Sequence, residues 1–151
     1  MKDLELAKEM KDALERNAKK WPHRLNHMLG LSLVDCSRQE RYIEYEFSSQ
    51  DWMKNPYDGV HGGITSSVVD TCMGLGAVAL SQSYVTTTDL SVSFLKAMTG
   101  ERYLVRVEYT QLGKRMIRCM AKVIDQKTGV LCATSMASFM AVAPLDQKEW
   151  A

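Results

Sequence analysis

One long apolar helix is predicted over residues 64–81, and the segments after it are typical of β-strands. The helix carries a wide apolar face at helical spacing, formed by Ile64, Val68, Val69, Cys72, Leu75, Val78 and Ala79. Such a helix must be covered, and a curved sheet wrapped around it does so most economically. The chain has 151 residues, which is enough for one domain with a substantial core.

Alternation of polar and apolar residues predicts strands on both sides of this helix. The expected strands cover residues 30–34, 41–47, 86–95, 102–111, 115–124 and 130–142. Because the last four have short connections, we expect them to pair antiparallel as a meander. Residues 3–19 predict an amphipathic helix that ends before Pro22. The expected class is therefore α+β, with residues 1–22 as a helical extension and 23–151 as the domain.

Composition and charge exclude several classes of function. The chain has 19 Lys and Arg against 18 Asp and Glu, a balance that argues against nucleic-acid binding. We expect no membrane span, since no apolar run approaches about 18 residues. The charged N-terminal segment is unlike a signal peptide, so we expect a cytoplasmic protein. Cys36, Cys72, Cys119 and Cys132 lack metal-ligand spacing, so we expect buried reduced thiols and no metal site.

Residues 55–63, Asn-Pro-Tyr-Asp-Gly-Val-His-Gly-Gly, run directly into the central helix. They end a long loop, and long loops in compact domains are often functional. Gly62 and Gly63 allow a ligand to approach the backbone closely. The unpaired N–H groups of the first helical turn, at the positive end of the helix dipole, would stabilise a polarised carbonyl or an oxyanion.

Asp70 is the only charged residue from His61 through Thr88. Its helix face carries small residues, namely Gly63, Ser66, Ser67, Gly74 and Ala77. A carboxylate in such surroundings is a candidate base or nucleophile. The alternatives are a solvated helix position or an aspartate that accepts hydrogen bonds from Ser66 or Ser67.

Gly62 and Asp70 are separated by about 12 Å along one helix, at about 1.5 Å per residue. An aspartate side chain cannot bridge that distance. If both groups act on one substrate carbon, they must come from two chains. We therefore predict a symmetric homodimer with two shared sites.

The combination of Asn55, His61-Gly62-Gly63 and Asp70, followed by Met73-Gly74, resembles the hotdog-fold acyl-CoA thioesterases of the PaaI-like type. These belong to the 4-hydroxybenzoyl-CoA thioesterase superfamily. The resemblance covers roughly residues 25–142. It implies a hotdog fold, in which a long helix is wrapped by a curved antiparallel sheet, and an assembly that is a dimer or a tetramer.

The resemblance also implies roles for individual residues, with coenzyme A as part of the substrate and no separate cofactor. Asp70 matches the carboxylate that activates water or attacks the thioester. Gly62 matches the glycine whose N–H polarises the carbonyl, and Asn55 matches the asparagine that orients the nucleophile or substrate. His61 matches a positioning histidine. Thr87 falls where relatives carry Ser or Thr near the water.

Further residues are candidates for substrate contacts. Gly63 would lie beside the thioester. Trp52 would line the acyl pocket or form a lid that packs on the dimer. Lys114, Arg115 and Arg118 would bind the phosphates of coenzyme A, although such a cluster is also usual at the end of a charged hairpin.

Two other functions remain open at this point. A non-catalytic acyl-CoA binding or sensor protein would use the same fold, but it would not need the Asp70 carboxylate. A hotdog hydratase or dehydratase would use His61 as its base. The acyl group, and the choice between coenzyme A and an acyl-carrier protein, stay undetermined.

Overall fold

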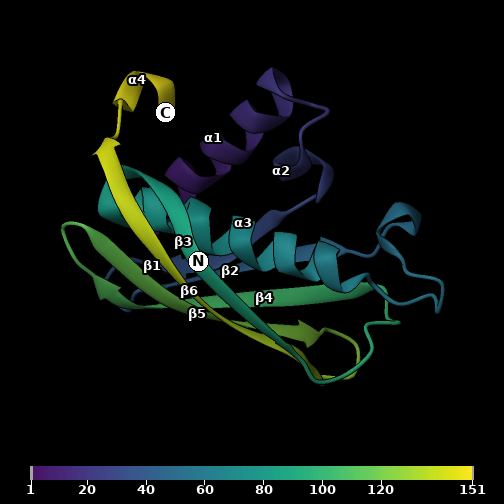
Figure 1. Cartoon of the computed structure of the whole chain (residues 1–151). Helices are drawn as coiled ribbons and strands as arrows, with labels where there is room; N and C mark the ends of the chain where they lie inside the picture. The colour runs from purple at the N-terminus through teal and green to yellow at the C-terminus, as the bar shows by residue number, and fades with distance from the viewer. Residues whose placement is uncertain (1, 151) are drawn as a thin grey trace.

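The computed structural model describes residues 2–150 and shows an antiparallel sheet wrapped around one long helix (Figure 1). The helix is α3 (Gly62–Ser81). The strands are β1 (Ser32–Ser37), β2 (Tyr42–Ser48), β3 (Ser83–Phe94), β4 (Arg102–Leu112), β5 (Met116–Asp125) and β6 (Leu131–Pro144). They form a six-stranded sheet in the order β1-β2-β4-β5-β6-β3. The predicted α+β hotdog architecture is confirmed.

The position of β3 differs from the expected meander of four strands. Strands β4, β5 and β6 do form a meander, but β3 pairs with β6 and not with β4. Strand β4 pairs with β5 on one side and with β2 on the other, so it has no side free for β3. Strand β3 pairs instead with the side of β6 that β5 leaves free. Within residues 2–150, the outer side of β3 has no partner strand and forms one edge of the sheet.

Helix α3 begins at Gly62, two residues before the predicted start. His61 caps it, since its Nδ1 accepts a hydrogen bond from the Gly63 N–H at 2.9 Å. Gln82 ends the helix in the left-handed region, at φ 55°, with its N–H bonded to the Val78 carbonyl. The two glycines expected in the loop therefore form the first helical turn.

The length and composition of α3 are those of a membrane-spanning helix, with a mean hydropathy of 1.4 over an 18-residue window. This corrects the expectation that no segment approaches such a length. Half of that window is buried inside the molecule. Wrapping by the sheet accounts for the apolar character, as in any core helix.

Two buried tyrosines of the sheet bind the backbone of α3. Tyr45 of β2 donates its hydroxyl to the Cys72 carbonyl at 2.9 Å, and Tyr109 of β4 donates to the Met73 carbonyl at 2.7 Å. Burial raises the pKa of both hydroxyls well above the ordinary value, so they remain protonated donors. The helix can approach this closely because of Gly76, where an added Cβ would overlap the Tyr109 hydroxyl and lie 2.7 Å from Ile43 Cδ1.

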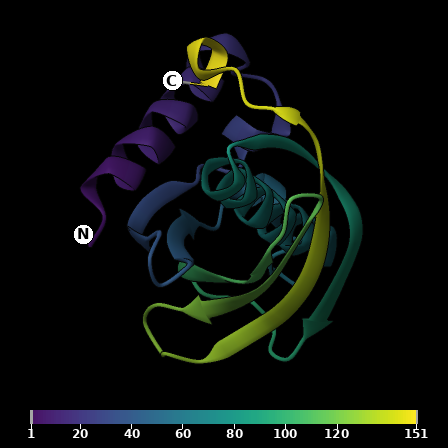
Figure 2. The same cartoon turned by 90° about the vertical axis from the view of Figure 1, so that its left-hand side faces the viewer.

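Three shorter α-helices, α1 (Leu4–Lys20), α2 (Leu25–Met28) and α4 (Gln147–Trp150), and one 3-10 helix, η1 (Asp51–Met53), complete the fold. Figure 2 shows α1 on the side of α3 opposite β3. Asp3 caps α1 by accepting the Leu6 N–H at 3.0 Å. The apolar face of α1 joins the core that surrounds α3, through Leu6, Ala7, Met10 and Ala13. The division of the chain at residue 22 stays a prediction.

The four cysteines are free thiols and all are buried, as expected. None is paired with another. Their side chains fill the core between the sheet, α3 and α1.

Candidate active site

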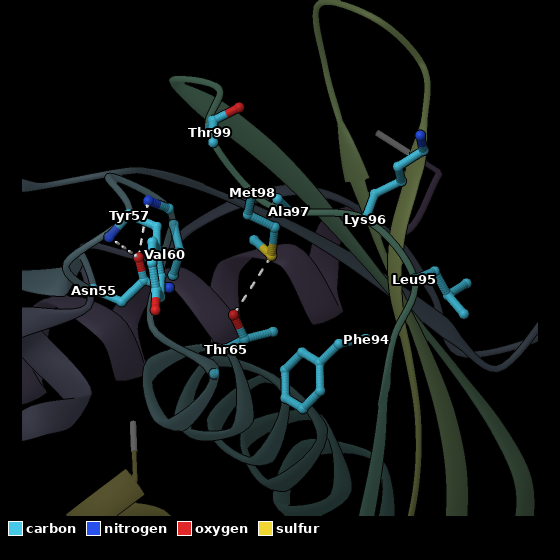
Figure 3. A pocket seen from close by; sticks show the side chains of 12 residues that line it. Asn55, Tyr57, Val60, Thr65, Phe94, Leu95, Lys96, Ala97, Met98 and Thr99 are labelled. Atoms are coloured by element: carbon cyan, nitrogen blue, oxygen red, sulfur yellow. Dashed lines mark hydrogen bonds between the residues drawn. The ribbon is translucent and has the colours of Figure 1, made fainter.

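A first cavity of about 470 Å³ opens at the start of α3, between the loop after β2 and the segment after β3 (Figure 3). Its lining includes Asn55, Val60, Gly62, Phe94, Lys96 and Met98. Most of its walls are apolar, with a polar corner at Asn55 and a charge at Lys96.

The Gly62 N–H is one of the free donors that line this cavity. Its neighbour, the Gly63 N–H, is used by the His61 side chain. Among residues 2–150, no group accepts a hydrogen bond from Gly62 N–H, and it stands at the positive end of the dipole of α3. The Phe94 ring covers Gly62 closely, since a Cβ there would lie 3.3 Å from Phe94 Cζ. The geometry allows a carbonyl oxygen to be bound at this N–H.

Asn55 shapes the loop that forms one wall. Its Oδ1 accepts the N–H groups of Tyr57 at 2.9 Å and Gly59 at 3.2 Å, and its own N–H binds the Gly59 carbonyl. This turn holds Asp58 at φ 63°, a left-handed conformation that aspartate tolerates. The Asn55 side-chain NH₂ has no partner among residues 2–150 and is available to a substrate.

A second cavity, of about 210 Å³, opens on the opposite half of α3 and contains Asp70. Thr87 of β3 donates its hydroxyl to Asp70 Oδ1 at 2.9 Å. This bond joins two of the predicted site residues and orients the carboxylate. Oδ2 has no hydrogen-bond partner among residues 2–150, so one oxygen is free for chemistry.

The small residues around Asp70 have separate roles. Ser66 and Ser67 donate to the carbonyls of Gly62 and Gly63, each at 2.9 Å, so the alternative in which they bond to Asp70 is wrong. Ala77, two turns after Asp70 on the same helix face, is fully buried, so neighbouring residues cover the small-residue face at that end. Gly74 does line the cavity, where a Cβ would lie 3.3 Å from Phe139 Cε1.

Cys119 lies in the core near Asp70. Burial, and to a lesser extent the charge of Asp70, raise the pKa of its thiol to about 12. The thiol therefore stays protonated near neutral pH and is a poor nucleophile. Among the described residues, Asp70 is the one charged residue in the lining of this cavity.

Trp52 and the basic residues predicted to bind coenzyme A line neither cavity. Trp52 is 42% exposed and donates its indole N–H to Gln50 Oε1, so the lid alternative remains open. Lys114 and Arg115 lie in the turn between β4 and β5, and Arg118 lies on β5. Their predicted role stays a prediction. Among residues 2–150, no three His, Cys, Asp or Glu side chains gather as a metal site would require.

Several lining residues were not predicted, among them one aromatic ring and one amide side chain. Phe94 ends β3 at the first cavity, and Asn26 of α2 lines the second. The alternation in β3 could have indicated Phe94, since it shares a face with Val92. Nothing in the local sequence around Asn26 indicates a contact with Asp70's cavity.

The two cavities share no lining residue. Within one chain, the Gly62 N–H and the Asp70 carboxylate therefore belong to separate pockets on one helix. This agrees with the spacing argument made from the sequence.

Comparison with known proteins identifies the family. The thioesterase superfamily matches residues 57–132, which include Gly62, Asp70 and Thr87. The chain belongs to the thioesterase superfamily. A Halobacterium salinarum relative, named "Putative esterase VNG_1336C", is 34% identical over 84 residues, covering 52% of this chain and 56% of the relative. The match thus spans little more than half of that relative.

Solved structures show the same fold at low sequence identity. Thioesterase HI1161 from Haemophilus influenzae is 17% identical, with a TM-score of 0.76 over 89% of this chain and 93% of that one. The E. coli PaaI protein of the phenylacetic acid degradation operon is 13% identical, with a TM-score of 0.74 over 89% and 96%. A Streptococcus mutans protein bound to acetyl-CoA is 17% identical, with a TM-score of 0.70 over 77% and 91%.

Proposed function

We propose that this protein is a cytoplasmic acyl-CoA thioesterase that hydrolyses a thioester to a free acid and coenzyme A. The observation that carries the proposal is the Asp70 carboxylate, oriented through one oxygen by Thr87 and free at the other. Membership of the thioesterase superfamily supports thioester hydrolysis as the reaction. The acetyl-CoA found in a protein of the same fold supports coenzyme A as the carrier.

In the proposed reaction the carbonyl oxygen binds the Gly62 N–H, which stabilises the negative charge that develops on it. The free oxygen of Asp70 attacks the carbonyl carbon or takes a proton from an attacking water. When Asp70 acts as base, the bond between carbon and sulfur breaks and the proton that Asp70 took from water passes to the sulfur, so that coenzyme A leaves as its thiol. When Asp70 is the nucleophile, the same bond breaks to give a mixed anhydride with Asp70, and the thiolate takes its proton from solvent. A water then hydrolyses the anhydride, which releases the free acid and restores the carboxylate. The reaction requires no metal and no further cofactor.

The proposed active species is a homodimer, because within one chain the Gly62 N–H and the Asp70 carboxylate lie in separate cavities. A two-fold axis between antiparallel α3 helices would bring Gly62 of the partner subunit beside Asp70. The unpaired edge of β3 supports this arrangement, since long exposed edge strands usually pair or are covered. Association of two such dimers gives the alternative tetramer.

The proposal is tested by thiol release from a panel of aromatic and straight-chain acyl-CoAs. Hydrolysis of at least one thioester is expected, and the rates across the panel rank the acyl groups. Binding of acyl-CoA without turnover of any ester would instead place the protein in the sensor class. Loss of activity in His61→Ala, with Asp70 dispensable, would favour a hydratase.

Shared sites predict that two inactive variants restore each other. Asp70→Asn and Asn55→Ala chains, each inactive alone, are expected to recover about a quarter of wild-type activity when refolded together at equal amounts. Half of the dimers would be mixed, and each mixed dimer would hold one intact site. Thiol release before and after co-refolding measures this. Sites built within one chain would give no recovery.

A further inference from the structure

A cluster of cations lies at the corner between α1 and α2, beside a small cavity whose lining residue Asn26 also lines the Asp70 cavity. Residues 16–27 carry six basic or histidine side chains and no acidic one, namely Arg16, Lys19, Lys20, His23, Arg24 and His27. We call Lys20, Arg24 and His27, which surround Trp21, the cationic corner. Four of the cations in this segment are permanently charged, in a chain whose net charge is only +1.

The cationic corner is ordered by its aromatic residue and its backbone. Lys20 Nζ and Arg24 Cζ each lie 4.7 Å from the centroid of the Trp21 ring. The N–H groups of Trp21, Arg24 and His27 are bonded in successive turns, at 2.9, 3.1 and 3.1 Å. No carboxylate within residues 2–150 forms an ion pair with Lys20 or Arg24. These charges are therefore held in place but not neutralised.

Asn26 connects the cationic corner with the reactive carboxylate. A cavity of about 160 Å³ is lined by Trp21, Arg24, Asn26, His27 and Asn17. Asn26 also lines the cavity that contains Asp70. The two cavities therefore meet at the Asn26 side chain. Lys114, Arg115 and Arg118 border neither of them.

We propose that the cationic corner binds the phosphate groups of coenzyme A while the thioester lies at Asp70. The inference rests on the proposed function and names the residues that hold its carrier. Coenzyme A carries a diphosphate and a 3′-phosphate, and Arg and Lys bind phosphates through charge-assisted hydrogen bonds. The pantetheine arm passes Asn26, whose amide can bond to the amides of the arm.

This placement also orients the acyl group. With the phosphates at the cationic corner, the acyl chain points away from Asn26, toward the first cavity of the partner subunit. That cavity is the larger of the two and is walled by Val60, Phe94 and Met98. Arg24 and His27 line a cavity, and Lys20 stacks on the Trp21 ring beside it, which favours a small nucleotide over an acidic carrier protein.

Direct binding tests the proposal without using catalysis. Titration calorimetry with coenzyme A, 3′-dephospho-coenzyme A and pantetheine would compare wild type with Lys20→Gln/Arg24→Gln. Affinity for coenzyme A is expected to fall at least about tenfold in this variant, as loss of charged hydrogen bonds implies. Affinity for pantetheine is expected to stay unchanged. Lys8→Gln/Lys11→Gln, which removes two exposed charges from α1, the helix that carries Lys20, should leave both affinities unchanged.

Kinetics provide a second readout. The cationic-corner variant is expected to raise KM for an acyl-CoA about tenfold with little change in kcat. The N-acetylcysteamine thioester of the same acid, which lacks the nucleotide, should react equally with wild type and variant.

The outcomes separate this inference from the proposed function. Wild-type affinity for coenzyme A in the cationic-corner variant overturns the inference, as does a loss found instead in Lys114→Gln/Arg115→Gln. In either case hydrolysis by the wild type would leave the proposed function standing. If no thioester is hydrolysed but coenzyme A binding falls only in the cationic-corner variant, the function is wrong and the binding site stands. Loss of turnover confined to acyl-carrier-protein substrates would overturn the inference in favour of a protein partner.

Discussion

Replacement of Asp70 by asparagine is expected to lower kcat for acyl-CoA hydrolysis about a thousandfold, within the range typical for loss of a general base or nucleophile. The asparagine oxygen can still accept the Thr87 hydroxyl, so the local structure is retained. The amide can neither take a proton from water nor attack the thioester. Single-turnover and steady-state thiol release measure the loss.

Two controls distinguish a loss of the reactive carboxylate from a loss of structure or of orientation. The midpoint of urea unfolding of Asp70→Asn should match wild type, because the residue lies on the partly exposed face of α3. Thr87→Val, which removes only the orienting hydrogen bond, should lower kcat by about tenfold, since it leaves the carboxylate in place. Full activity in Asp70→Asn would refute the proposed chemistry.

Gly76→Ala is expected to lower the free energy of unfolding by about 3 kcal/mol, at the upper end of the cost of overpacking a core. The added methyl group would occupy the space of the Tyr109 hydroxyl and crowd Ile43. Either α3 moves away from the sheet or the bond from Tyr109 to the Met73 carbonyl breaks. The gain in helix propensity, about 1 kcal/mol, is too small to compensate. Urea denaturation measures the difference.

Gly74→Ala is the matched control on the same helix. Its methyl group would meet only the edge of the Phe139 ring, at 3.3 Å, so a change within about 1 kcal/mol is expected. In a Tyr109→Phe background, Gly76→Ala should cost less than in wild type, because the closest clash is removed. Equal stability of Gly76→Ala and wild type would show that the tight contact is not maintained in solution.

The sequence was sufficient to predict α1, α3 and the six strands, but not the short helices α2 and α4 or every pairing between strands. Helical periodicity identified α3, and alternation identified all six strands. The neighbour of β3 was predicted wrongly because alternation shows which face of a strand is buried, not which strand lies beside it. Either β2 or β3 could pair with the free side of β4. Which of them does so depends on the arrangement of the whole sheet, in which β2 takes that side.

The candidate site likewise contains residues that the sequence could identify and residues that it could not. Asp70 and Gly62 were identifiable because a lone charge and a glycine pair stand out in an apolar helix. The link between Asp70 and Thr87 required a family resemblance, since it joins α3 to a strand. Asn26 had no signal at all, because its place in the lining of the Asp70 cavity depends on where the chain positions α2 after α1.

The hydroxyl bonds from Tyr45 and Tyr109 have a consequence for the aim of the reactive carboxylate. They bind carbonyls at two successive positions, Cys72 and Met73, and successive positions on a helix differ by about 100° around its axis. Together the two bonds fix the rotation of α3 about its own axis. A turn of the helix by one position would break both bonds and swing Asp70 away from Thr87. Two phenols on the inner face of the sheet therefore determine where a carboxylate on the outer face of the helix points.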